Sequence, residues 1–257
     1  IIIDINIVNE IINLSHKTLS KYHYFFYPEI KEYLNSEELF EIETYINNEG
    51  IDSLNFDKMR LTGENEQYIC EIIRKDSVID FVSYVNRINL SLNSVIKTSI
   101  FETNPVLILK EPNLIEYASF YGSIQIFQYL KFNNVQMEPI LWLYSIHGQN
   151  PEIIHLLEEN YVEPPDKTYQ ICFDLSVKCH HNNIANYFKD NYLESKINDY
   201  KKIFKYYNYD QIKSIFSFDG SCFYYLCFYN YSKLVELYLK EREDHNKFII
   251  ITYINIV

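Results

Sequence analysis

The segment LIEYASFYGSIQIFQYL, from Leu114 to Leu130, decides the fold of this chain. Its apolar residues recur at helical spacing on both sides of one glycine, Gly122. Glycine accepts the left-handed backbone that a tight turn between two helices requires. The segment therefore predicts two short antiparallel helices, packed together through Leu114, Ile115, Ala118, Ile126, Phe127 and Leu130.

The same pattern of apolar residues, which we call the frame, recurs along the chain. The segment LWLYSIHGQNPEIIHLL, from Leu141 to Leu157, repeats it with a shift of 27 residues, and further copies follow after 31 and then 50 more. One copy lies 45 residues upstream. Because one helix pair has more apolar surface than it can bury alone, stacked pairs would bury it together. We expect about five degenerate pairs between residues 68 and 240, whose second helices carry Phe81, Val82, Tyr84 and Val85; Ile126, Phe127, Tyr129 and Leu130; Ile153, Ile154, Leu156 and Leu157; Ile184, Ala185, Tyr187 and Phe188; and Leu234, Val235, Leu237 and Tyr238.

An asparagine and then, two residues later, an aliphatic residue follow three of these second helices. Asparagine tolerates a left-handed backbone, so we expect it to end the helix, while the aliphatic side chain holds the next loop. The pairs are Asn133 with Val135, Asn160 with Val162, and Asn191 with Leu193. Asn150 is expected to cap the helix that begins at Pro151.

The chain divides into three parts on this reading. Residues 1–63 form a helical N-terminal region, residues 64–240 form the repeats, and residues 241–257 form a tail. A helix is expected from Asn35 or Ser36 to Gly50, and a connection over residues 51–63. Both ends are rich in Ile and Asn, so we expect the first ten or so residues to be disordered or non-native and the chain to be a fragment of a longer protein.

Composition narrows the class of function. The chain has 257 residues, 47% of them hydrophobic, and a formal net charge of −12. An acidic protein repels phosphate backbones, so nucleic acid is not an expected partner. No run reaches the roughly 18 apolar residues of a membrane span. The five cysteines include no Cys-x-x-Cys and no signal peptide is visible, so we expect reduced thiols in a cytoplasmic protein.

The segment LIEYASFYGSIQIFQYLKFNNV resembles an ankyrin repeat. The places of the ankyrin pattern are taken by Ala118, Gly122, Ile126, Phe127, Leu130 and Asn133. The chain departs from the family at the start of the repeat, where Asn113, Leu114, Ile115 and Glu116 stand in place of Thr-Pro-Leu-His. The later glycine places hold Gln149 or Gly148, His180 and Asn230, and the spacing of 27 to 50 residues differs from the usual ~33.

Residues 35–240 as a whole are similar to a large ankyrin family of trichomonad protists, in which a helical region of unknown function precedes the repeats. The likeness is carried by NEQYICEIIRKDSVIDFVSYVNRINLSLNS, SIFETNPVLILKEPNLIEYASFYGSIQIFQYL, LWLYSIHGQNPEIIHLLEEN, KYYNYDQIKSIF and FYYLCFYNYSKLVELYL. The resemblance implies an all-α helical-repeat solenoid that serves as an interaction scaffold.

The sequence carries no established catalytic or metal-binding motif. The chain has no nucleophile elbow, phosphate loop or dinucleotide fingerprint, and we expect neither an enzyme nor a cofactor. The best metal candidate is the cluster of Cys172, Cys179, His180 and His181, although zinc ligands usually come in two separated pairs. A metal-dependent or thiol enzyme that uses this cluster is the alternative function. Cys227 near His245, or Cys70 near any histidine, has no base supplied by the local sequence.

Partner binding is expected on the residues just before each turn. If the ankyrin resemblance holds, these residues face the concave groove, and they are apolar and aromatic. They are Phe120, Tyr121, Ile146, His147, Lys178, Cys179, Phe228 and Tyr229. The opposite reading, in which these rings are buried between repeats, stays open. Trp142, the only tryptophan, is either a buried anchor or an exposed binding residue.

The function expected from the sequence is therefore protein–protein interaction by a monomer through the concave face. A secreted or host-directed ankyrin effector is a further alternative.

Overall fold

The computed structural model describes residues 4–13, 19–49, 51, 53–193, 200–208, 210–211 and 220–243. These residues form helices joined by turns and loops, with one isolated bridge between Val95 and Asn113. The described part of the chain contains no β-strand, which confirms the all-α prediction. None of its helices combines the length and the apolar character that crossing a bilayer requires.

The chain falls into two compact units, which are described separately. Unit 1 comprises Ile1–Ala118 with Gln128–Val135, and unit 2 comprises Ser119–Phe127 with Gln136–Val257. Unit 1 contains α1 (Ile5–Asn13), α2 (Lys21–Phe25), α3 (Tyr27–Ile30), the 3-10 helix η1 (Lys31–Tyr33), α4 (Ser36–Asn48), α5 (Ser53–Thr62), α6 (Tyr68–Arg74), α7 (Val78–Ile88) and α8 (Pro105–Leu109). Unit 2 contains α11 (Leu141–Gly148), α12 (Pro151–Glu159), α13 (Gln170–Lys178), α14 (Asn182–Asn191), α15 (Tyr200–Lys205), α17 (Gly220–Phe228) and α18 (Ser232–Glu243). Helices α9 (Leu114–Phe120) and α10 (Ile124–Phe132) have residues in both units.

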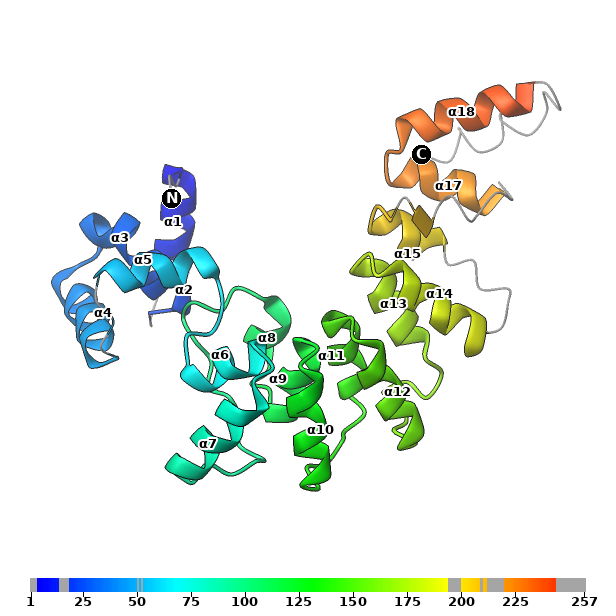
Figure 1. The fold of residues 1–257 in the computed structure, drawn as a ribbon. Helices are drawn as coiled ribbons and strands as arrows, with labels where there is room; N and C mark the ends of the chain where they lie inside the picture. Colours follow the sequence, from blue (N-terminus) through cyan, green and yellow to red (C-terminus); the bar gives the residue numbers. More distant parts are fainter. Residues whose placement is uncertain are drawn as a thin grey trace. The chain divides into compact units, whose positions relative to one another are not determined.

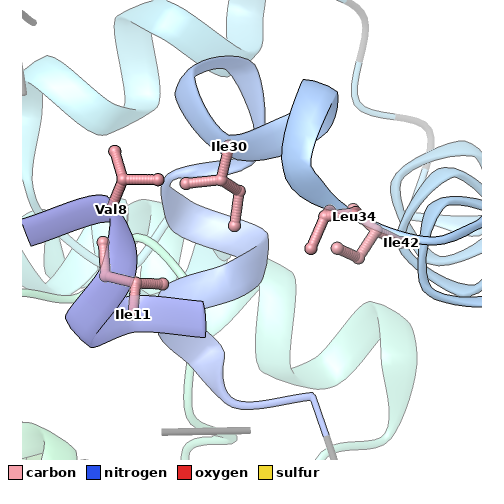
Figure 2. Packing of buried hydrophobic residues seen from close by; sticks show 5 residues of the cluster. All are labelled: Val8, Ile11, Ile30, Leu34 and Ile42. Carbon is pink, nitrogen blue, oxygen red and sulfur yellow. The ribbon is translucent and has the colours of Figure 1, made fainter. Parts of the chain in front are cut away.

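The N-terminal helices have a hydrophobic core of their own. Side chains of α1, α3 and α4 converge on it, as Figure 2 shows. Its buried members are Val8, Ile11, Ile30, Leu34 and Ile42. The disorder expected for the first ten residues is therefore not found from Ile5 onward, because the apolar face of α1 is buried in this core.

Helix α4 confirms the predicted N-cap. The Asn35 side chain accepts hydrogen bonds from the backbone N–H groups of Glu37 and Glu38, both at 3.0 Å. The Glu38 carboxylate in turn accepts from the Asn35 N–H at 2.9 Å, which completes a capping box. The capping box explains why α4 begins at Ser36.

The predicted connection over residues 51–63 is wrong, because Ser53–Thr62 forms α5. Phe56 of this helix is buried in the core, and a second core-facing position is taken by an arginine, Arg60, whose side chain is 3% exposed. The guanidinium lies over the rings of Phe25, Phe26 and Phe56, and its Nη2 donates to both carboxylate oxygens of Glu29 at 2.7 and 2.8 Å. A charged residue in the core removes the apolar periodicity by which a helix is recognised in a sequence.

Successive helix pairs turn through one residue in the left-handed conformation. This residue has a φ of +49° to +68° in each of the six turns. The six are Asp76, Gly122, Gln149, His180, Tyr207 and Asn230. The tight helix–helix turn predicted at Gly122 is found, and Gln149, not Gly148, is its equivalent in the next pair. The turn at Tyr207 belongs to a further helix pair. The sequence pattern did not predict this pair, which lies within the interval of 50 residues between the last two predicted pairs.

The exits of the second helices differ from the prediction in one detail. The left-handed residue is Asn134 or Tyr161, one position after the asparagine that was expected to take this conformation. The side-chain amides of Asn133, Asn160 and Asn191 instead donate to the carbonyl four residues earlier, at 2.8, 2.6 and 2.8 Å. At Asn133 and Asn160 the same carbonyl also accepts from the backbone N–H of the asparagine, at 3.1 and 3.2 Å, so the side chain adds a second hydrogen bond at the end of the helix. Val135 is buried as expected, and its N–H donates to the Leu130 carbonyl at 3.1 Å.

The first helices of successive pairs pack on one another in unit 2. Contacts run from α11 to α13, from α13 to α15, and from α15 to α17, while α12, α14 and α18 each pack on their own first helix. Figure 1 shows this succession from green through yellow to orange. The left-handed turns therefore follow one another along this unit.

Candidate protein-binding surface on the hairpin turns

Two glycines bring the first two turns of unit 2 into close contact. A Cβ atom at Gly148 would lie 2.2 Å from the Ser119 carbonyl oxygen and 2.7 Å from the Gly122 nitrogen. A Cβ at Gly122 would lie 2.6 Å from the Gly148 carbonyl oxygen. The Asn150 amide, which also caps α12, donates to the Gly122 carbonyl at 2.9 Å. The backbones of these turns thus approach to a distance that only glycine permits.

Side chains continue this connection through the next turns. The His147 Nδ1 lies 3.8 Å from the Cys179 Sγ, and the His180 Nε2 lies 2.9 Å from the Tyr206 carbonyl oxygen. The Asn208 amide donates to the Val177 carbonyl at 2.9 Å. Each of these contacts joins one turn to the next.

The last turn is joined in the same way. The Tyr231 hydroxyl donates to the Phe204 carbonyl at 2.8 Å, and the Tyr231 ring stacks on Tyr207 with centroids 5.3 Å apart. An unbroken series of contacts therefore links the five turns from Gly122 to Asn230.

The two residues that precede each left-handed residue lie beside this series. We call their solvent-accessible members the turn surface: Tyr121, His147, Lys178, Cys179, Lys205, Tyr206, Phe228 and Tyr229. Lys178 and Lys205 are exposed, and the Phe228 side chain is 64% exposed. The Lys205 ammonium lies 5.4 Å from the centroid of the Tyr206 ring. Tyr224, 47% exposed, stacks on Phe228 and extends the aromatic area.

Three of the predicted partner-binding residues are buried. Ile146 and Trp142 have no exposed area, and Phe120 is 8% exposed. The Trp142 indole donates to the Val162 carbonyl at 2.7 Å and meets the rings of Tyr169 and Phe188 edge-on. This is the buried anchor, one of the two readings left open. Ile146 entered the prediction because the turn was placed one residue too early, at Gly148.

Phe120 is buried and packs against residues of the turn surface. Its ring stacks on the His147 imidazole at 5.0 Å and contacts the rings of Tyr121 and Tyr144 edge-on. At this turn the reading in which the rings are buried between repeats therefore holds, whereas at Phe228 the ring faces solvent.

The pKa shifts of His147 and Cys179 favour the uncharged form of both side chains. Burial, with smaller contributions from His181 and Lys178, lowers the pKa of His147 to about 4. Burial also raises the pKa of the Cys179 thiol. Both shifts favour a neutral imidazole beside a neutral thiol, whereas an activated nucleophile needs a thiolate beside a protonated imidazole.

The proposed metal cluster does not come together. Cys172 is fully buried in α13, and burial raises the pKa of its thiol to about 12. His180 contacts the Tyr206 carbonyl instead of pointing to a cysteine. Among the residues that the structure describes, no three His, Cys, Asp or Glu side chains are placed to hold a metal ion. Cys70 is buried, and His245, suggested as a partner for Cys227, lies outside the described residues.

Sequence reasoning missed three members of this area. Lys205 and Tyr206 precede the turn at Tyr207, which the sequence frame did not include, and Tyr224 lies one helical turn before Phe228. The signal available for Lys205 and Tyr206 was the segment KYYNYDQIKSIF, which carries the ankyrin likeness but was not divided into a first and a second helix.

The ankyrin resemblance rests on the residues of this chain alone. It remains a prediction for which the repeated turn geometry is the available support. Comparisons with protein-family models, with curated proteins and with solved structures found no match.

Proposed function

We propose that this chain is a non-catalytic protein-interaction scaffold, built as a solenoid of divergent ankyrin-like helix pairs, that binds a protein segment through the turn surface. The observation that carries the proposal is the contrast between backbone and side chain at the turns. The backbone repeats, with a left-handed residue at each turn, while the side chains before that residue change from turn to turn. A repeated frame that presents variable side chains suits recognition of an extended partner.

The composition of the turn surface indicates what kind of partner fits. Exposed aromatic rings of Tyr224 and Phe228 supply apolar contact area, and aromatic residues dominate binding energy at protein interfaces. Lys178 and Lys205 add two positive charges to a chain whose net charge is −12. A segment that carries both apolar side chains and carboxylates matches this surface.

Matched surface variants test the proposal. The purified chain is immobilised, partners are captured from an extract of its source cells, and the amounts are compared between the wild type and Tyr224→Ser/Phe228→Ser. We expect the variant to capture at least about 10-fold less of the bound partners, since an aromatic hot spot of an interface contributes about 2 kcal/mol or more. Tyr161→Ser, at a tyrosine 91% exposed in the same unit but away from the turns, serves as the control. Equal capture by all three proteins would show that the partner binds elsewhere.

A further inference from the structure

Lys21, at the start of α2, carries a half-buried positive charge whose hydrogen-bond partner is a neutral backbone carbonyl. Its Nζ donates to the backbone carbonyl of Glu102 at 2.6 Å. The described residues give this ammonium no carboxylate at ion-pair distance, since the Glu102 carboxylate accepts instead from the Asn104 N–H at 2.8 Å. Burial lowers the pKa of Lys21 and raises the pKa of Glu102, because it destabilises the charged form of each side chain. A buried charge is stabilised when an opposite charge reaches it.

Two hollows of unit 1 meet at this lysine. One of about 180 Å³ is lined in part by Asn65, Ser99 and Tyr117 and has a mixed polar and apolar wall. The other, of about 290 Å³, is lined mainly by apolar side chains, including Phe25, Phe26, Pro105 and Leu109. Lys21, Glu102 and Ile108 belong to the walls of both hollows.

The apolar hollow opens at a rim of exposed apolar side chains. Leu109 is 86% exposed and Tyr22 is 47% exposed. An aliphatic chain that entered between them would reach Phe25 and Phe26 and bring a group at its end to the ammonium of Lys21. The arrangement combines a largely apolar wall and a positive charge in one hollow.

We infer that unit 1 binds a small anionic amphiphile, whose carboxylate or phosphate pairs with Lys21 and whose aliphatic chain lies on Phe25, Phe26, Ile108 and Leu109. The anion supplies the close opposite charge that Glu102 does not supply. The aliphatic chain covers apolar side chains that water otherwise contacts. This site lies outside the turn surface and is independent of the proposed protein partner.

Calorimetric titration of the full chain with octanoate tests this inference. We expect saturable binding of one octanoate, and octylamine, with the same chain and the opposite charge, should bind at least about 10-fold more weakly. Octyl phosphate and inorganic phosphate distinguish the sources of the anion: an amphiphile site binds the first and not the second. Absence of saturable octanoate binding, or equal binding of octylamine, would overturn the proposal.

Three variants locate the site. Lys21→Met keeps the length of the side chain without its charge and should weaken octanoate binding about 10-fold or more. Glu102→Gln removes the negative charge that repels the ligand and should tighten binding. Leu109→Glu places a carboxylate at the exposed rim and should weaken binding, whereas Leu61→Glu, the same change at an 81% exposed leucine of α5, should not. Since both leucines are exposed, this last pair decides the question even if Lys21→Met fails to fold, and equal affinities of the two would refute the site.

Discussion

Gly148→Ala is the substitution that tests the packing of the hairpin turns most sharply, because two physical effects oppose each other there. Gly148 is the last residue of α11 and has no left-handed conformation to preserve. Intrinsic helix propensity alone would therefore favour alanine by up to about 1 kcal/mol. The added methyl group, however, would lie 2.2 Å from the Ser119 carbonyl oxygen and 3.0 Å from the Gly122 Cα.

Steric overlap decides whether Gly148→Ala stabilises or destabilises the protein. The atoms in the way belong to the backbone, so the two turns must separate by about 1 Å to restore van der Waals contact. Overpacking of this kind typically costs about 1–3 kcal/mol. Separation would also stretch the 2.9 Å hydrogen bond from Asn150 to the Gly122 carbonyl, which adds about 1 kcal/mol. After subtraction of the propensity gain, we expect a net loss of about 1–3 kcal/mol, or a Tm about 2–12 °C lower.

Thermal and urea denaturation, followed by circular dichroism and by the fluorescence of Trp142, measure this loss. Gln149→Gly provides the control in the neighbouring position. Gln149 is left-handed, with a φ of +53°, so glycine should relieve strain there and raise stability by up to about 1 kcal/mol. If Gly148→Ala is as stable as the wild type or more stable, the close approach of the two turns is refuted.

Three further outcomes follow from the contacts described above. Trp142→Phe removes the donor to the Val162 carbonyl and should lower the free energy of unfolding by about 1–3 kcal/mol, measured by urea denaturation with circular dichroism; an unchanged midpoint would contradict the buried hydrogen bond. Glu29→Ala removes the closer carboxylate of the buried Arg60, leaves that of Asp57 at 3.5 Å, and should cost about 3 kcal/mol, while Glu29→Ala/Arg60→Met should recover most of the loss, and two equal losses would mean that the pair is not coupled. His147 has a pKa of about 4 in the folded protein and about 6.5 in the unfolded chain, so unfolding takes up a proton between these values and stability falls as the pH is lowered from 6.5 towards 4. His147→Phe should therefore show a shallower fall of Tm over this range, and parallel curves for the two proteins would contradict the buried imidazole.

The repeated frame of the helix pairs was predictable because its signal is local. A glycine at a turn, an asparagine cap before Pro151 and apolar residues at helical spacing each act within a few residues of the chain. The turn at Tyr207 was missed because tyrosine carries no sequence signal for a left-handed backbone. In the folded chain, the contact between its ring and the Tyr231 ring stabilises this conformation.

Contacts between distant residues were not predictable from the sequence. Arg60 replaces an apolar residue in α5 because Glu29, 31 positions earlier, and three phenylalanine rings compensate its charge. His147 meets Cys179 across 32 positions, and Lys21 meets the Glu102 carbonyl across 81. Such partners are brought together by the packing of helices, and a single sequence gives no sign of which distant residues will meet.

Site-specific photocrosslinking tests the central claim, that the turn surface binds a protein partner, most directly. A photoreactive amino acid is placed in turn at Lys178, Lys205 and Phe228 of the turn surface, and at Tyr161, a highly exposed position of unit 2 away from the hairpin turns. We expect one and the same partner to be crosslinked from the three turn positions in the source cells and not from Tyr161. Crosslinks from Tyr161 alone, or no common partner among the three turn positions, would contradict it.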